Sequence, residues 1–169
     1  MKCLICNNAE MICTKKPHHY TESGLDNICL EGIDVCECPS CGEEIVNIPA
    51  VPELHSLIGR HIVKKKSPLN GREVRFLRKN AGLTAKRLST MIGIDAATIS
   101  RWENGVQSLA PSNDRLIRLI YSGIKGVPGE DTKHLIEKDF EAIENDVASD
   151  VTPFHFPPGA WCKLKECLA

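Results

Sequence analysis

The sequence predicts an α+β protein with three parts: a small cysteine-rich β module, an all-α helix-turn-helix bundle, and an extension of one helix plus a β-hairpin. Three observations predict this class. Seven of the nine cysteines lie before residue 42. Apolar residues recur at helical spacing through the centre of the 169-residue chain. The final segment joins an acidic amphipathic stretch to two strand-like stretches around a Pro-Pro-Gly turn.

These patterns divide the chain into four parts. We expect a metal-binding module over residues 1–48, a linker helix over 49–66, a helix-turn-helix domain over 67–124 and an extension over 125–169. Neither an apolar leader nor a stretch long enough to cross a bilayer occurs. We therefore expect a cytoplasmic protein with no membrane partner.

Two C-x-x-C pairs have the spacing of metal-binding knuckles. Cys3 and Cys6 form the first pair, and Cys38 and Cys41 form the second. Each pair can turn two thiolates toward one ion, and two pairs complete a tetrahedral site with Zn–S distances of about 2.3 Å. An odd number of cysteines in this arrangement favours metal over disulfides, so we predict a structural Zn²⁺.

The gap between the two pairs must contain structure of its own, because it exceeds the roughly 15–20 residues of a zinc ribbon. We expect a short antiparallel hairpin there, with arms at 27–30 and 33–38 around Glu31-Gly32. Cys36 would lie on the same strand face as Cys38, which makes Cys36 an alternative ligand.

The other polar and sulfur-bearing residues of the module have simpler interpretations. We expect Cys13 and Cys29 to be small apolar fillers, and His18 and His19 to be exposed loop residues. The paired knuckles also resemble those of rubredoxin, which would imply iron. Because Asn7 follows the first pair where that protein has Gly, an iron or redox protein is the minor alternative.

Residues 83–105 predict two short helices joined by a tight turn. Thr84 can cap the first helix, and Gly93 lies where its backbone must become left-handed. Asp95 is expected to cap the second helix, which runs from 96 to 104. The apolar residues expected on the inner faces are Leu88, Met91, Ile92, Ile99 and Trp102.

The outer face of the second helix is small and polar at its N-terminal half, as suits a helix that enters a DNA major groove. The segment LTAKRLSTMIGIDAATISRWENG resembles the helix-turn-helix of the Xre/Cro-like family, and a helical hairpin without a ligand is the alternative. The resemblance implies sequence-specific binding of double-stranded DNA. Where the family often has a phosphate-clamping Gln, this chain has Ala85. The expected DNA-contacting residues are Thr84, Lys86, Arg87, Ala96, Ala97, Thr98, Ser100 and Arg101.

Charge is strongly uneven along the chain. Residues 60–101 contain eleven basic and two acidic side chains, a net charge of +9, so the remainder carries −10 of the overall −1. A basic centre suits a polyanionic partner, although a solvated charged face would give the same pattern.

Helices are expected on both sides of the motif. Asn70 with Glu73 reads as a capping box for a helix ending near Asn80. In the Xre family an Arg of this helix pairs with the Glu of the WExG-like segment, and the matching residues are Arg78 and Glu103. Pro111 is expected to open the next helix, whose core residues would be Leu116, Ile117, Leu119 and Ile120.

The N-terminal MKCxxC, the second C-x-x-C and the Xre-type domain together resemble the MqsA/YgiT antitoxin family, from residue 1 to about 124. The resemblance implies an N-domain that folds around zinc and, in some members, binds a ribonuclease toxin. It also implies a C-domain that dimerises and represses its own operon. The family reads bases with an Asn and an Arg; the Arg matches Arg101, but the Asn position is Ala97.

We therefore expect a non-enzymatic, homodimeric transcriptional repressor with a palindromic operator, and an antitoxin role is the alternative. In the extension we expect an amphipathic helix over 130–146 and a hairpin with arms at 151–156 and 161–164. Cys162 and Cys167 are not in ligand spacing. The expected apolar stripe of the helix is Leu135, Ile136, Phe140 and Ile143.

Overall fold

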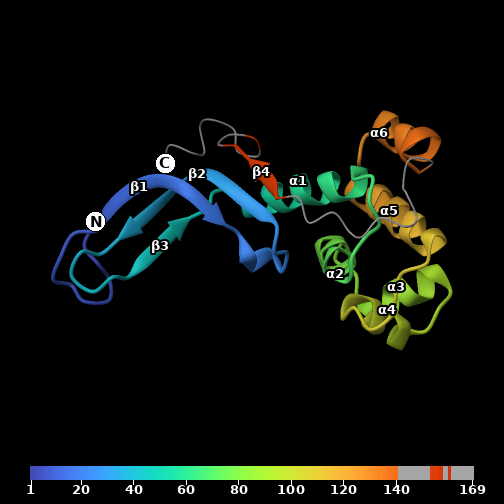
Figure 1. Cartoon of the computed structure of the whole chain (residues 1–169), viewed down its shortest axis with the longest axis horizontal. Helices are drawn as coiled ribbons and strands as arrows, with labels where there is room; N and C mark the ends of the chain where they lie inside the picture. The colour runs from blue at the N-terminus through green and yellow to red at the C-terminus, as the bar shows by residue number, and fades with distance from the viewer. Residues whose placement is uncertain (141–152, 158–159, 161–169) are drawn as a thin grey trace. The chain divides into compact units, whose positions relative to one another are not determined.

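The computed structural model describes residues 1–140, 153–157 and 160, and the chain divides into two compact units. The sheet unit contains Met1–Glu22, Asp26–Leu54 and the described residues of 152–169. The helical unit contains Ser23–Leu25 and the described residues of 55–151. Strands with the cysteines come first in the chain and helices follow, which confirms the predicted α+β class (Figure 1).

The sheet unit is built around one long central strand, β2 (Figure 1). β1 and β3 pair with β2 in antiparallel orientation, and β4 pairs with it in parallel. A short 3₁₀ turn, Thr21–Ser23, follows β1. The strands are β1 (Ile12–His19), β2 (Ile28–Glu37), β3 (Glu44–Asn47) and β4 (Phe154–Phe156).

The expected hairpin around Glu31-Gly32 is wrong, because β2 continues through these residues. Glu31 and Gly32 together lie opposite Pro17, which makes a β-bulge between β1 and β2. Gly32 has φ 62°, the left-handed region that a bulge can require, and Pro17 has no N–H for the ladder. The extra residue shifts the alternation of faces, so residues on both sides of the bulge enter the core. These are Ile28, Leu30, Ile33 and Val35.

β1 corrects four further expectations. His18 and His19 lie in this strand rather than in a loop. Cys13 lies directly opposite Cys36 and forms a disulfide with it. Cys13 is therefore not a small apolar packing residue, and Cys36 is not an alternative ligand of the metal site. The expectation that the cysteines bind metal rather than form disulfides is wrong for this pair. These expectations failed because β1 pairs with β2 and brings Cys13 opposite Cys36. The expected hairpin had no strand at Cys13.

The helical unit is built from six helices and one π-helical turn within the described residues (Figure 1). Its apolar core takes residues from α1 to α5, among them Ile58, Leu77, Leu88, Ile99 and Tyr121. No helix among the described residues has the length and apolar character needed to span a membrane. The elements are α1 (Val51–Lys64), α2 (Gly71–Asn80), α3 (Ala85–Ile92), α4 (Ala96–Glu103), α5 (Pro111–Lys125), α6 (Gly129–His134) and the π-helical turn Leu135–Asp139.

Two glycines permit close packing of these helices. A Cβ on Gly59 of α1 would lie 1.9 Å from the hydroxyl oxygen of Tyr121 on α5. A Cβ on Gly71, the first residue of α2, would lie 2.2 Å from the carbonyl oxygen of Trp102 on α4. The Tyr121 hydroxyl donates to the Asn80 side-chain oxygen at 2.8 Å. These contacts fix α1 and α2 against α5 and α4.

Some expected core positions are exposed instead. Met91 is 42% exposed, Leu116 36% and Ile136 51%. The buried face of α5 contains Ile117 and Tyr121 together with the ion pair of Asp114 and Arg118, and Leu116, two positions from each member of the pair, lies on the other side of the helix.

In the C-terminal extension, the described residues of the expected helix over 130–146 are helical, whereas the described strand has a partner that was not expected. A π-helical turn follows α6 and ends at Asp139, and Leu135 is buried there. β4 pairs with β2 in parallel. Ile143, the expected arm 161–164, Cys162 and Cys167 lie outside the described residues.

Candidate metal centre and nucleic-acid interface

The two C-x-x-C pairs converge at one end of the sheet unit. The Sγ atoms of Cys3, Cys6, Cys38 and Cys41 all lie within 4.8 Å of one another. The Sγ atoms of Cys3 and Cys41 are 3.6 Å apart, as are those of Cys6 and Cys38. A tetrahedron with Zn–S bonds of about 2.3 Å has edges of about 3.8 Å, so these sulfur atoms can surround one metal ion.

The two knuckles share one backbone design. The amide of Asn7 donates to the carbonyl of Cys3 at 3.1 Å, and the amide of Gly42 donates to the carbonyl of Cys38 at 2.9 Å. Asn7 has φ 56° and Gly42 has φ 74°, so both occupy the left-handed region. Asn is one of the few non-glycine residues that adopts this conformation readily. Asn7 therefore replaces the usual glycine without changing the turn.

The knuckle backbone favours thiolates. The amide of Asn8 donates to the sulfur of Cys6, and this bond is the main reason that the pKa of the Cys6 thiol falls to about 6. The amides of Cys6 and Ile5 lower the pKa of Cys3 in the same way. At Cys41 the amide of Glu43 acts in this direction too, but burial and the other three sulfur atoms outweigh it and raise the pKa to about 12. Four anions cannot share this space alone, so the cluster suits a cation.

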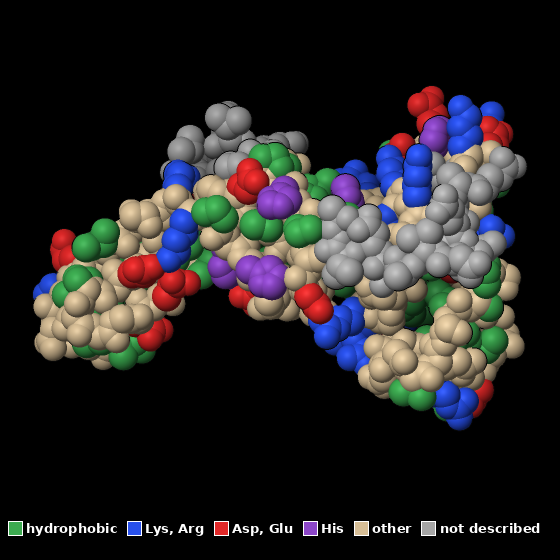
Figure 2. All heavy atoms as spheres, viewed as in Figure 1, with side chains coloured by type: hydrophobic (Ala, Val, Ile, Leu, Met, Phe, Trp, Pro, Cys, Tyr) green, Lys and Arg blue, Asp and Glu red, His purple; other side chains and the backbone are tan. Residues whose placement is uncertain are grey.

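The core around the cluster is small. It contains Cys3, Cys36, Cys38 and Met11, with Ile45 packed at its margin. By contrast, large apolar side chains beside the first knuckle reach the surface of the sheet unit, where hydrophobic side chains are visible near its knuckle end (Figure 2). They are Met1 (65% exposed), Leu4 (76%), Ile5 (70%) and Ile12 (61%).

The residues expected to form a helix-turn-helix fold as α3 and α4 with a short connection between them. The Thr84 hydroxyl accepts from the amide of Arg87 at 3.0 Å, and Gly93 ends α3 with φ 79°. Asp95 stands at the N-cap position of α4 in extended conformation, but its side chain makes no capping hydrogen bond. Ile99 and Trp102 are buried and fix the inner face of α4.

The residues expected to contact DNA lie on the accessible side of these two helices. On α3 and its cap, Thr84, Lys86 and Arg87 are exposed. On α4, Ala97, Ser100 and Arg101 are exposed and two others are half-buried. The half-buried residues of the set are Ala96 and Thr98.

Arg78 on α2 is joined to Glu103 at the end of α4. The Arg78 guanidinium donates to both carboxylate oxygens of Glu103, with Nη2 at 2.9 Å from Oε2, and also to the carbonyl of Leu83 at 2.9 Å. The carboxylate raises the pKa of Arg78. Arg75 is a second partner of the same carboxylate, at 3.2 Å. Glu103 thus connects α2 to the last turn of α4.

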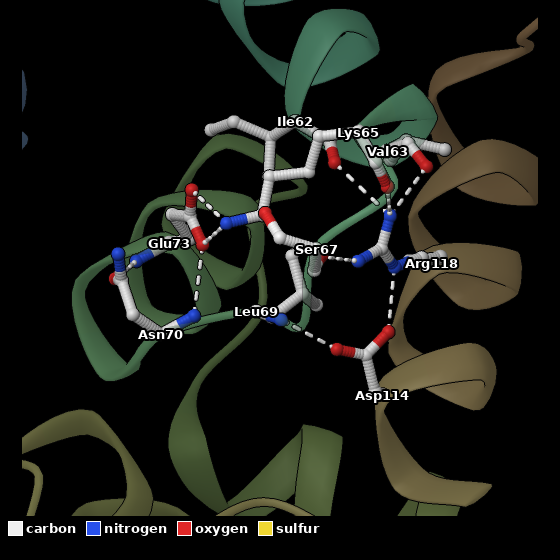
Figure 3. Close-up of polar contacts among 9 residues, drawn as sticks. All are labelled: Ile62, Val63, Lys65, Ser67, Leu69, Asn70, Glu73, Asp114 and Arg118. Carbon is white, nitrogen blue, oxygen red and sulfur yellow. Dashed lines mark hydrogen bonds and ion pairs between the residues drawn. The ribbon is translucent and has the colours of Figure 1, made fainter. Parts of the chain in front are cut away.

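A second polar network, which the sequence analysis missed, holds the segment between α1 and α2 (Figure 3). Arg118 of α5 is fully buried and pairs with Asp114 one turn earlier. Asp114 also accepts from the amide of Leu69 at 2.6 Å. Arg118 further donates to backbone carbonyl groups at the end of α1 and just beyond it, those of Ile62, Val63, Lys65 and Ser67.

The network continues to the start of α2. The ammonium group of Lys65 lies 2.8 Å and 2.7 Å from the two carboxylate oxygens of Glu73, which is 1% exposed. Glu73 and Asn70 form the predicted capping box. Burial raises the pKa of Glu73 although Lys65 opposes that shift. The sequence feature that could have predicted the role of Arg118 is its position four residues after Asp114, on the inner face of an amphipathic helix.

The chain matches the model of a known protein family. The model described as the antitoxin component of a bacterial toxin-antitoxin system, MqsA, matches residues 1–122. This range includes both knuckles and the helix-turn-helix. A search among curated proteins returned no match.

Proposed function

The chain belongs to the MqsA antitoxin family, and we propose on this premise that it is a zinc-containing antitoxin that represses transcription by binding DNA. The observation that carries the DNA-binding part is the pairing of α3 and α4. A buried inner face holds α4 in place, and its outer face is small and polar with Arg101 at the surface. This arrangement suits insertion into a major groove.

Zinc is the proposed occupant of the four-cysteine cluster. Four thiolates in tetrahedral spacing are the ligand set of structural zinc sites. The bound ion would neutralise the thiolates and hold the two knuckles together. The cluster has no position left for substrate or water, which fits a structural rather than a catalytic ion.

The proposed active form is a homodimer on a palindromic operator. A dimer places two recognition helices about 34 Å apart, one turn of the DNA, and requires two inverted half-sites. Basic residues of α3, with Lys86 and Arg87 exposed, would contact phosphates beside each half-site.

The proposed toxin surface is the exposed apolar patch of the first knuckle. Leu4 and Ile5 are 76% and 70% exposed, and Met1 and Ile12 lie in the same small region of sequence. Exposed apolar side chains that gather in this way mark protein interaction sites. The toxin would be a ribonuclease, as the resemblance of the sequence to this family implies.

DNA binding is tested by titrating fluorescent DNA from upstream of the protein's own gene with the full chain, at two salt concentrations. Scrambled DNA of the same length is the control. We expect tighter binding to the upstream DNA by a factor of about 10³ or more, and weaker binding to both DNAs at the higher salt. Equal affinity for both sequences would contradict the repressor.

The toxin surface is tested with Leu4→Asp/Ile5→Asp, expressed together with any ribonuclease encoded beside the gene. We expect the variant to lose copurification with that ribonuclease while it keeps its metal and its DNA affinity. Lys15→Asp, on exposed β1, is the matched control. Copurification that survives in the double variant would contradict this surface.

A further inference from the structure

A disulfide lies beside the four-cysteine cluster and joins the two strands that carry its knuckles. Cys13, the second residue of β1, lies opposite Cys36, the last residue but one of β2, and the two are bonded. The first knuckle precedes β1 and the second follows β2, so both lie at the end of the sheet unit where β1 begins and β2 ends (Figure 1). Cys36 is buried in the same small core as Cys3 and Cys38. The disulfide is therefore a second bridge between the strands that a metal in the cluster would connect.

The disulfide shortens the loop that a metal ion must close. Without it, an ion that joins Cys6 to Cys38 closes a loop between positions 32 residues apart. With it, the connection runs from Cys6 to Cys13, across the bridge and from Cys36 to Cys38, a path of about ten positions. The probability that the ends of a flexible loop meet falls with about the 3/2 power of its length. The shorter path therefore favours metal binding by about sixfold.

A reductant can reach this bridge from the side of Cys13. Cys13 is exposed, whereas Cys36 is 8% exposed. One sulfur of a small dithiol attacks the Cys13 sulfur, the S–S bond breaks, and Cys36 leaves as a thiolate that takes up the proton of the attacking group. The second sulfur of the dithiol then displaces Cys13 in the same way. The dithiol ends as a disulfide and both cysteines end as thiols, which is a transfer of two electrons.

The strand ladder keeps the two thiols together after reduction. The Cα atoms of Cys13 and Cys36 are 3.9 Å apart, and β1 pairs with β2 on both sides of them. β3 also pairs with β2 at Cys36. Backbone hydrogen bonds make these pairings, so a small disulfide can form the bridge again by the reverse exchange.

We propose that the Cys13–Cys36 disulfide is a reversible redox switch that raises the affinity of the four-cysteine cluster for zinc. This inference rests on zinc as the proposed occupant of the cluster. In the cytoplasm, the compartment expected from the sequence, disulfides are usually transient or redox-sensing. Because linkage is reciprocal, bound zinc should favour the disulfide over the two thiols by the same factor. Reduction would thus destabilise the knuckle region, which carries Leu4 and Ile5 of the proposed toxin surface.

The test is a competition for zinc between the full chain and a chromophoric chelator, without oxygen, before and after reduction with a phosphine. A phosphine is chosen because small thiols would themselves bind zinc. We expect reduction to weaken zinc binding by about sixfold. Cys13→Ala/Cys36→Ala should weaken it by the same factor with no reductant present. Alkylation of free thiols and mass spectrometry of the peptides verify which cysteines are joined.

Cys29→Ala is the matched control, since Cys29 is a free cysteine of β2 outside the disulfide and the cluster. Its zinc affinity should equal that of the wild type, and reduction should weaken it by the same factor. Circular dichroism checks that each protein is folded. The proposal is overturned if either reduction or the double substitution changes the zinc affinity by less than about twofold, or raises it. Failure of every form to bind zinc would refute the proposed metal centre itself, and the switch with it.

Discussion

The knuckle region of the sheet unit and the helical unit are stabilised by different means. Among the described residues, the core around the knuckles contains four buried side chains, three of which are cysteines. The helical unit instead buries apolar side chains from five helices and satisfies its buried charges internally. Where little apolar surface is buried, a bound metal of the kind proposed for the four-cysteine cluster would supply the missing stability. Where more is buried, polar networks can determine how the elements are joined.

The largest effect should follow removal of a metal ligand. Structural zinc contributes about 10–16 kcal/mol in small peptides, far more than the small knuckle core can supply. Cys38→Ser should therefore unfold the knuckle region and release zinc, while the helical unit keeps its helical circular dichroism. Metal content and proteolysis near the knuckles measure the two outcomes.

Cys29→Ser is the matched control, because Cys29 is free and lies outside the four-cysteine cluster. It should keep the structural zinc. An ordered knuckle region in metal-free Cys38→Ser protein would remove the contrast between the two units.

Residues that act through local chemistry were predictable from the sequence. Thr84 and Gly93 were identified because capping and left-handed φ depend on a few neighbouring residues. The four clustered cysteines were identified because C-x-x-C spacing itself forms the knuckle. For Asp95 the predicted N-cap position is confirmed, but the side chain makes no capping hydrogen bond.

Residues that depend on register were not predictable. Glu31-Gly32 resembles a hairpin turn, and only pairing with β1 shows that it is a bulge. The same pairing brings Cys13 to Cys36, which are 23 positions apart in the chain. The role of Arg118 was missed because most of its acceptors are backbone carbonyls of a segment distant in sequence. Every residue has a carbonyl, so the sequence does not indicate which ones accept.

The next largest effect should come from the network of the helical unit. Arg118→Met keeps the apolar volume but leaves Asp114 as an unpaired buried charge. Breaking a buried pair in this way costs about 3–5 kcal/mol. We expect the free energy of unfolding of the helical unit, measured with urea, to fall by that amount.

Arg115→Met on the same helix is the control. Among the described residues Arg115 donates one hydrogen bond, to the carbonyl of Phe140 at 3.1 Å, so its loss should cost about 1 kcal/mol. Equal losses for the two variants would mean that the buried network contributes no more than the single hydrogen bond of a half-buried side chain.

A smaller effect is expected at the pair between α2 and α4. Arg78 is 12% exposed and Arg75 is 43% exposed, and both contact Glu103. Arg78→Ala should cost about 1.5–3 kcal/mol, the range for hydrogen bonds to charged groups, because Arg75 still shields the carboxylate. Arg75→Ala should cost less than about 1 kcal/mol.

The double variant at these positions sharpens that comparison. Removal of both arginines leaves Glu103 buried and unpaired, so the loss should exceed the sum of the single losses. Urea unfolding of the four proteins in this cycle gives the coupling free energy. Strict additivity would show that the two arginines act independently.

The smallest effect in free energy should be the most informative about function, since it separates base reading from phosphate binding within the helix-turn-helix. Arg101 is exposed on α4, and Ala97 beside it offers only a methyl group. A guanidinium there can donate two hydrogen bonds to guanine O6 and N7, worth about 1–3 kcal/mol of discrimination. Arg87 is exposed on α3 and is the proposed phosphate contact. Arg101→Ala should therefore bring the affinities for operator and scrambled DNA closer together. Arg87→Ala should lower the affinity for operator and scrambled DNA by the same factor. It should also reduce the slope of the logarithm of affinity against the logarithm of salt concentration by about 1, which corresponds to one phosphate contact. Binding titrations of both variants on both DNAs at two salt concentrations separate the roles, and equal losses for Arg101→Ala on the two DNAs would make it a phosphate contact.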